Sequence, residues 1–134
     1  MAITETPPRP AQRKRGSPES KIQASCVAWM HNTYPEYRGL YFAVQNENSR
    51  ADSNASTGAI RRAVGVVSGV SDTIFLLPRG KYICLCVEFK TEIGRQSDAQ
   101  KSWQAKVESI GAMYVICRSL EQFKKIIENY LQLQ

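Results

Sequence analysis

Three side chains that could do chemistry together stand at the ends of two apolar segments. Asp72 opens the segment Asp72–Leu77, while Glu88 and Lys90 close the segment Lys81–Lys90. Both segments are rich in the residues typical of strands. Since side chains alternate along a strand, Glu88 and Lys90 point to the same face. Charged groups in apolar strands cost free energy, so their presence here needs a physical reason.

A turn at Pro78–Gly80 separates the two segments and predicts an antiparallel hairpin. If the turn is centred near Gly80, the numbers of facing residues sum to about 160, and Asp72 lies opposite or nearly opposite Glu88. Facing Cβ atoms lie about 4.5–5.5 Å apart, so the two carboxylates repel unless a cation lies between them. Oxygen ligands favour Mg²⁺, with Mn²⁺ as a substitute.

This arrangement suits hydrolysis of a phosphodiester without a covalent intermediate. A cation between Asp72 and Glu88 would activate water and neutralise charge on the phosphate. Lys90 would hold the attacking water or stabilise the transition state. The alternative is that each charge is an ordinary strand end, with Glu88 and Lys90 an exposed pair and Asp72 a turn residue. Their joint placement at one end of one hairpin favours a site.

Other catalytic sets find little support in the sequence. His31 is the only histidine and lacks a partner motif, so we expect it on the surface of the first helix. Cys84 and Cys86 lie two apart in an apolar run and are interpreted as core residues of a strand. No CxxC pair occurs among the four cysteines, which argues against a zinc site.

The elements around the hairpin follow from periodicity and capping signals. Helical spacing predicts an amphipathic helix over 19–33, with Ser17 as its cap and Pro18 at its first position. The other predicted elements are a strand at Leu40–Gln45, a loop at Asn46–Gly58, a loop at Glu92–Ser97, a helix over 98–110 stopped at Gly111, a buried strand at Ala112–Cys117 and a last helix capped by Ser119, with Gln122 at the capping-box position. Ala59–Val70 is ambiguous, although Gly65, Ser68 and Gly69 favour irregular backbone.

The predicted order is α-β-β-β-α-β-α in one domain over residues 19–134. The helix between the last two strands implies a crossover and a parallel pair, and therefore an α/β fold with a mixed sheet flanked by helices. Residues 1–18 are rich in proline and basic residues and are predicted to be a disordered basic tail. This start lacks the apolar stretch of a secretory signal, so we expect a cytoplasmic protein, in a host cytoplasm if the gene is viral.

These motifs resemble the PD-(D/E)xK (restriction-endonuclease-like) nuclease superfamily, and within it the virus-type replication-repair nuclease (VRR-NUC) domain in its stand-alone form. The resemblance covers roughly residues 19–131, and Ser71 stands where proline is usual, which we expect to loosen the turn before Asp72. The matching elements, in order, are Glu19 and Gln23, Asn46-Glu47, Gly69-Val70-Ser71-Asp72, Glu88-Phe89-Lys90 and Gln100-Lys101-Ser102-Trp103.

The resemblance implies roles for individual residues. Asp72 and Glu88 would bind the metal together with the backbone carbonyl of Phe89, and Lys90 would be catalytic. Glu19 would contribute through water, or would simply be a first-turn carboxylate favoured by the helix dipole. Gln100 would orient groups at the site, or would be a surface residue of a helix N-terminus. Trp103 is interpreted as a core residue rather than a platform for base stacking.

The charge of the chain points to a nucleic acid. The net charge is +6 and the pI about 9.3, which favours a polyanionic partner. We expect cations flanking the site to contact DNA phosphates without reading sequence, so DNA structure would direct cutting. Single-domain members of the family resemble Holliday-junction resolvases, which implies a homodimer and branched DNA. The candidate cations are Arg50, Arg61, Arg62, Arg95 and Lys101.

Two other functions remain open from the sequence. One is a non-catalytic DNA-binding module that keeps the nuclease fold, against which the intact Asp72, Glu88 and Lys90 argue. The other is an interaction protein whose basic tail is its only contact with nucleic acid. No apolar run approaches the roughly 18 residues that a membrane span needs, so neither alternative involves a bilayer.

Overall fold

A four-stranded mixed sheet forms the centre of the computed structural model, which describes residues 16–45 and 55–134. Antiparallel pairing joins the first three strands, and the third and fourth are parallel, which confirms the predicted α/β architecture. The strands, in spatial order, are β1 (Tyr41–Ala43), β2 (Thr73–Phe75), β3 (Leu85–Phe89) and β4 (Met113–Cys117). The helices are α1 (Pro18–Thr33), the short 3₁₀ turn η1 (Pro35–Tyr37), α2 (Ala55–Ala63), α3 (Asp98–Ser109) and α4 (Leu120–Leu131).

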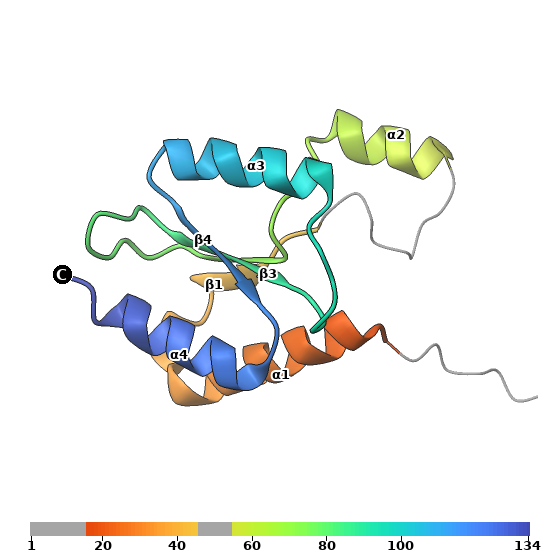
Figure 1. The fold of residues 1–134 in the computed structure, drawn as a ribbon. Coiled ribbons are helices and arrows are strands. Elements are labelled where there is room, and N and C mark those ends of the chain that lie inside the picture. The colour runs from red at the N-terminus through yellow and green to blue at the C-terminus, as the bar shows by residue number, and fades with distance from the viewer. Residues whose placement is uncertain (1–15, 46–54) are drawn as a thin grey trace, which may run out of the picture.

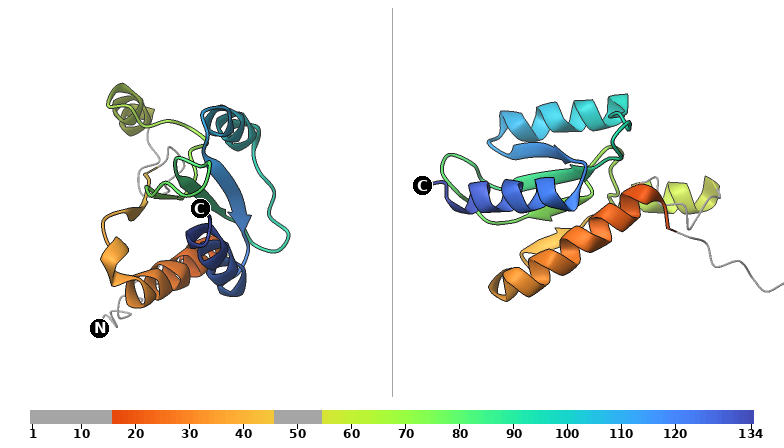
Figure 2. Two further views of the ribbon diagram at one scale, coloured as in Figure 1. Left: turned by 90° about the vertical axis from the view of Figure 1, so that its left-hand side faces the viewer. Right: turned by 60° about the horizontal axis from the view of Figure 1, so that its bottom comes forward.

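Helices cover the sheet on both faces (Figure 1). Helices α1 and α4 lie side by side on one face and α3 lies on the other, an arrangement that Figure 2 shows end-on. The core under α1 and α4 is rich in aromatic side chains, and the core under α3 is smaller. The larger core includes Cys26, Met30, Tyr41, Phe75, Leu85, Val87, Phe89, Phe123, Ile127 and Tyr130. Within the described residues, no helix has both the length and the apolar character needed to cross a membrane.

Both predicted helix caps, Ser17 and Ser119, are present, and a third cap was not predicted. The hydroxyl of Ser17 accepts a hydrogen bond from the N–H of Ser20 at the start of α1, and Pro18 occupies its first turn. Ser119 caps α4 as expected, although the side chain of Gln122 accepts from the Arg118 N–H and does not complete a capping box. A reciprocal capping box forms instead at α3, between Ser97 and Gln100. These local bonds satisfy N–H groups that would otherwise lack partners.

Helix α2 occupies residues for which no helix was predicted. The predicted loop at Asn46–Gly58 is wrong for residues 55–58, and irregular backbone within Ala59–Val70 is wrong for residues 59–63. Residues 46–54 lie outside the described part of the chain. Gly58 lies within the helix, where one glycine costs only about 1 kcal/mol. Gly65 ends the helix with φ +95°, and the N–H groups of residues 65 and 66 bond back to the carbonyls of Arg62 and Arg61. This is the hydrogen-bond pattern of a glycine-terminated helix.

The chain before Asp72 approaches the start of α3 so closely that only glycine fits. Gly69 has φ +84°, and a Cβ atom at this position would lie 2.3 Å from the backbone oxygen of Ala99. Ser71 is fully buried, and its hydroxyl donates a 3.0 Å hydrogen bond to the carbonyl of Thr73. The turn is therefore held by a bond that proline could not make, which acts against the loosening expected from Ser71. The approach of Gly69 to Ala99 positions Asp72 relative to α3.

We predict that Gly69→Ala lowers the free energy of unfolding by about 3 kcal/mol or more, because it adds a backbone collision to the strain of positive φ. Gly39→Ala is the matched control. Gly39 also has positive φ (+86°), but nothing lies within 4 Å of the position of its Cβ. Its cost should be about 1–2 kcal/mol. Urea denaturation of both variants measures the difference, and equal losses would show that the contact with α3 is unimportant.

Candidate active site

The hairpin of β2 and β3 has the register that the turn at Gly80 predicted. Thr73 pairs with Val87, so the numbers of facing residues sum to 160 (73 + 87). Asp72, one residue before β2, therefore faces Glu88 near the end of β3. The prediction that the two acidic positions oppose each other is confirmed. The ladder itself is shorter than the predicted segments Asp72–Leu77 and Lys81–Lys90, because the chain diverges near the turn.

Glu88 is buried, with 2% of its surface exposed. Its Oε1 atom accepts a 2.8 Å hydrogen bond from Nε2 of Gln100 and lies 3.7 Å from Nζ of Lys90. Its Oε2 atom is also buried and has no resolved hydrogen-bond partner among the described residues, although the Asp72 carboxyl is close enough to affect the pKa of Glu88. A buried oxygen without a partner normally costs about 1–3 kcal/mol, and more when it is charged.

Asp72 is partly buried and is held by the strand opposite. Its Oδ2 atom accepts a 2.7 Å hydrogen bond from the backbone N–H of Phe89. Burial raises the pKa of Asp72, while this backbone bond acts in the other direction. The hydrogen bond from the Phe89 N–H was not predicted from the sequence. The predicted register could have indicated it, because facing Glu88 places the Asp72 carboxylate beside the backbone of Phe89.

The two carboxylates strongly affect each other's protonation. Burial, followed by the negative charge of Asp72, raises the pKa of Glu88 to about 8. The positive charge of Lys90 acts against this shift. In the described residues, no group of three or more His, Cys, Asp or Glu side chains could hold a metal ion. Asp72 and Glu88 are therefore an acidic pair rather than part of a larger cluster of possible metal ligands in that part of the chain.

Lys90 and Gln100 complete the inner part of the site. Lys90 directly follows β3 and is buried, with 8% of its surface exposed, so its charge faces the carboxylate rather than bulk water. The amide of Gln100 is fixed at both ends: its oxygen accepts from the Ser97 N–H, and its nitrogen donates to Glu88. Gln100 thus contacts Glu88, as expected for a residue that orients the site. The capping box of α3 holds its side chain in this position.

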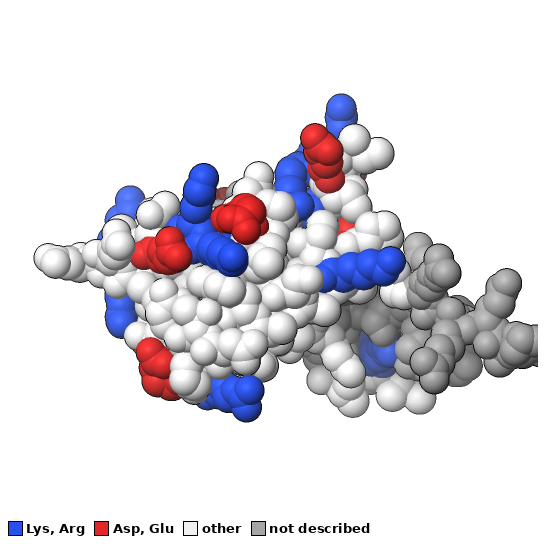
Figure 3. All heavy atoms as spheres, turned by 90° about the horizontal axis from the view of Figure 1, so that it is seen from below, with Lys and Arg blue, Asp and Glu red and all other residues white. Residues whose placement is uncertain are grey.

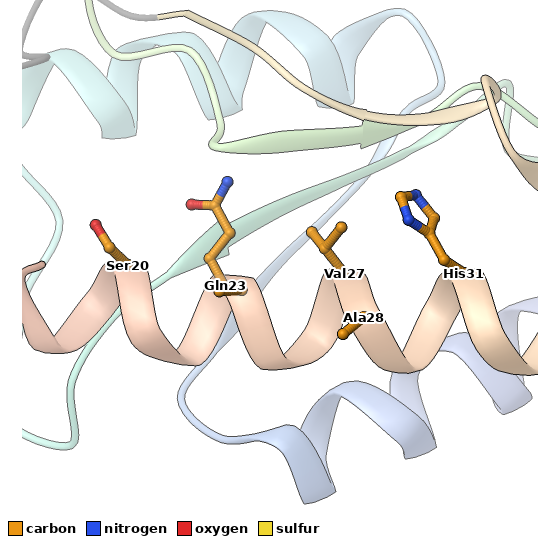
Figure 4. Close-up of a pocket in the computed structure, with 6 residues that line it drawn as sticks. Ser20, Gln23, Val27, Ala28 and His31 are labelled. Carbon is orange, nitrogen blue, oxygen red and sulfur yellow. The ribbon is translucent and has the colours of Figure 1, made fainter.

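The first turn of α1 also borders the site. The charge of Glu19 raises the pKa of both Asp72 and Glu88, so it lies close enough to act on both groups. Gln23, one turn further along, instead lines an open hollow beside α1 (Figure 4). Ser20, Val27 and His31 project from the same side of the helix in that view. The hollow has no acidic lining residue, and the partly buried His31 stands apart from the acidic pair.

The predicted DNA-contacting cations lie on two segments. Arg95 is exposed in the loop before α3, and Lys101 is exposed in the first turns of α3. Arg61 and Arg62 lie in the last turn of α2, at the same end of the molecule as the starts of α1 and α3 (Figures 1 and 2). The surface over α1 and α4, seen from below in Figure 3, mixes acidic and basic side chains. Arg50 and Asn46-Glu47 lie outside the described residues.

The residues expected to be structural have structural positions. Trp103 is partly buried and packs against Tyr114, with ring centroids 6.2 Å apart, as expected for a core residue. Cys86 is buried in the same cluster and Cys84 packs against it. The other two cysteines, Cys26 and Cys117, are buried in the larger core, and all four are free.

Comparison with known proteins agrees with the residue pattern. The sequence matches the VRR-NUC domain family over residues 9–121. A solved structure described as a VRR_NUC domain protein has a TM-score of 0.74 and 20% sequence identity, and the match covers 89% of this chain and 92% of that one. At this identity the likeness shows a shared fold. No curated protein matches the sequence. Because the family match spans most of the chain, this protein belongs to the VRR-NUC family and carries a nuclease domain.

Proposed function

We propose that this protein is a Mg²⁺-dependent, structure-specific DNA endonuclease that hydrolyses phosphodiester bonds in branched DNA, in the manner of a Holliday-junction resolvase. The observation that carries the proposal is the buried Oε2 atom of Glu88, which has no hydrogen-bond partner in the described part of the chain and lies on the strand facing Asp72. A non-catalytic module would have no reason to retain this costly arrangement. A cation that binds both carboxylates removes the cost.

The donor set fits magnesium. Carboxylate and carbonyl oxygens suit Mg²⁺ and Mn²⁺, and Mg²⁺ commonly keeps several waters and takes only one or two protein carboxylates. Asp72 and Glu88 would supply those carboxylates, and the backbone carbonyl of Phe89 would be a further ligand. Glu19 would contribute through water. When bound, the cation supplies positive charge that activates a water molecule and stabilises charge developing on the phosphodiester.

The other side chains of the site orient groups and hold charge. Lys90, 3.7 Å from Glu88, can donate to the attacking water or to a phosphate oxygen whose negative charge grows in the transition state. Gln100 fixes the orientation of Glu88 through Oε1 and leaves Oε2 available. The Phe89 N–H fixes Asp72 in the same way. Hydrolysis adds water across one P–O bond of the DNA backbone and leaves a phosphate at one new strand end and a hydroxyl at the other.

Basic residues outside the site would hold the DNA backbone. Arg95 and Lys101 are exposed beside the loop and helix that border the site, and Arg61 and Arg62 extend the same end of the molecule. Such contacts bind DNA without reading sequence, which favours recognition of DNA shape. Arg50 and the basic N-terminal tail would add to this attraction.

A homodimer would place two such sites on one branched substrate. Apolar side chains remain exposed on the part of the sheet that α3 does not cover. They include Leu40 directly before β1, Phe42 in β1 and Leu76 directly after β2. The exposed fractions of these three residues are 38%, 39% and 56%. An exposed apolar sheet surface next to an edge strand is suited to pairing with a second copy. A two-fold axis would then relate two cuts on a four-way junction.

The catalytic assignment predicts that Asp72→Asn, Glu88→Gln and Lys90→Ala each reduce kcat/KM for DNA cleavage at least about a hundredfold, because each removes charge stabilisation from the reacting phosphate. Glu108→Gln and Lys106→Ala change exposed residues of α3 and serve as matched controls. Gel assays with a labelled four-way junction in Mg²⁺ provide the measurement, and circular dichroism checks folding. Undiminished cleavage by Asp72→Asn would refute the assignment.

The pKa of Glu88 predicts how stability depends on pH. The pKa of Glu88 is near 4.5 in the unfolded chain and is raised to about 8 in the metal-free folded protein. Below pH 4.5 this shift contributes its full amount to the free energy of unfolding. The contribution is lost as pH rises from about 4.5 to 8, by at most about 1.4 kcal/mol per pH unit. Mg²⁺ binds the ionised form, so its stabilising effect should increase over the same range.

Urea denaturation in EDTA and in Mg²⁺ tests this prediction. The wild-type protein and Glu88→Gln are compared between pH 5.5 and 9. The difference between them should depend on pH in EDTA, and added Mg²⁺ should stabilise only the wild-type protein. A Mg²⁺ effect of equal size in Glu88→Gln would mean that the cation binds elsewhere.

The structural preference gives a separate prediction. Sedimentation equilibrium should show a mass near twice 15.1 kDa, and a four-way junction should be cut at least about tenfold faster than a linear duplex with the same arm sequences. Phe42→Glu should reduce both dimerisation and junction preference, since it places a charge on the exposed sheet surface. A monomer that cuts both substrates equally would exclude resolvase-like action but not nuclease activity.

A further inference from the structure

An exposed apolar side chain lies on the turn that directly follows Lys90. Ile93 has 89% of its surface exposed, more than any other large apolar residue found exposed in the described chain. It belongs to the turn formed by residues 91–94, in which the N–H of Gly94 bonds to the carbonyl of Thr91. Isolated exposed apolar residues are common on protein surfaces. The surroundings of Ile93, rather than its exposure alone, make it informative.

One arginine holds the backbone of this turn. Nη1 of Arg118, which follows β4, donates to the carbonyls of Thr91, Glu92 and Gly94 at 2.6, 3.2 and 2.8 Å. The backbone of Arg118 is itself held by the side chain of Gln122 in α4. A charged donor shared by three carbonyls fixes the turn to the core. Ile93 is therefore presented on a braced segment.

The turn is also packed against the proposed catalytic lysine. A Cβ atom on Gly94 would lie 3.4 Å from Cδ of Lys90 and 3.1 Å from Oγ1 of Thr91. Three residues of extended chain span at most about 11 Å, which limits the distance between the Cα atoms of Lys90 and Ile93. This distance equals about three base steps of DNA. Ile93 is thus anchored near the DNA segment whose phosphate Lys90 would contact.

The charges beside Ile93 favour contact of this turn with DNA bases rather than with phosphates. Glu92 is exposed next to it and would repel a phosphate, whereas Arg95, two residues further, is an exposed cation that can bind the backbone. A protein partner is less suitable, because the centres of protein interfaces are poor in charged residues. DNA-binding proteins use isoleucine, leucine and similar side chains as wedges that enter and unstack a base step.

We propose that Ile93 is a wedge that unstacks the DNA base step next to the cleaved phosphate, with Arg118 as the residue that positions it. The inference rests on the proposed nuclease function. A base step at a branch point is already weakly stacked, so insertion costs less there than in continuous duplex. The wedge would contribute to the preference for branched DNA without any contact that reads sequence.

Fluorescence of 2-aminopurine placed beside the cleavage position measures unstacking directly. The probe is a four-way junction in EDTA, so binding is observed without cleavage. The wild-type protein should increase the fluorescence, and Ile93→Ser should reduce this increase about tenfold with little loss of affinity, since one side chain supplies the wedge. Ile93→Leu should retain it. Ile110→Ser, an exposed isoleucine at the far end of α3, is the matched control.

A second variant tests the brace. Arg118→Gln removes the shared donor but leaves Ile93 in place. It should lower the fluorescence increase, while cleavage of a junction already unpaired at that step is retained.

In Mg²⁺, Ile93→Ser should slow cutting of the fully paired junction more than cutting of the unpaired one.

The outcomes separate the wedge from the nuclease function. If the wild-type protein cuts DNA but Ile93→Ser equals it in fluorescence and in both cleavage rates, the wedge is wrong and the nuclease proposal stands. If no DNA is cut but Ile93 is required for unstacking, the catalytic proposal fails, and with it the placement of the wedge beside a cleaved phosphate. If Ile93→Ser changes only the sedimentation of the protein, Ile93 belongs to a contact between copies and the wedge is refuted.

Discussion

Burial of the Glu88 carboxylate is the constraint on which the rest of the site depends. An acidic group inside a sheet costs several kcal/mol unless its oxygens are satisfied. Gln100 and Lys90 satisfy one oxygen, and the other has no hydrogen-bond partner among the described residues. Two acidic groups therefore face each other with one cationic side chain, that of Lys90, beside them. The same burial that weakens the metal-free site is what makes it suited to hold a cation.

The surrounding structure keeps these groups in place by contacts between distant segments. Gly69 allows the turn before Asp72 to lie against the backbone of Ala99 at the start of α3. That helix carries Gln100, which is locked by its own capping box before it reaches Glu88. The start of α3 therefore positions both carboxylates, Asp72 through the turn at Gly69 and Glu88 through Gln100. A site organised in this way loses little free energy to reorganisation when charge develops on a substrate.

Different ends of the fold carry different tasks. The hairpin turn near Gly80 and the C-terminus lie together, since Leu133 is close to Gly80. The starts of α1 and α3 and the end of β3 gather at the other end with the acidic residues and Lys90 (Figure 1). The shared core of α1 and α4 under the sheet is aromatic and closely packed. This core fixes the sheet, so the loops at the site end can carry functional residues on a rigid base.

The sequence alone was enough to predict elements and faces that depend on neighbouring residues. Alternation along the strands put Glu88 and Lys90 on one face, the position of Gly80 gave the pairing of Asp72 with Glu88, and serine residues marked the helix starts. Contacts between residues distant in the chain could not be read in this way. The bond from Phe89 to Asp72, the approach of Gly69 to Ala99 and the brace of Arg118 on the turn after Lys90 each join segments 17 to 30 residues apart. Helix α2 was not predicted because residues 46–58 are polar and because Gly65, Ser68 and Gly69 favoured irregular backbone, whereas Gly58 is tolerated within the helix and Gly65 follows its end. Periodicity and capping are local properties of the chain, while these contacts exist only once the sheet and helices have packed together.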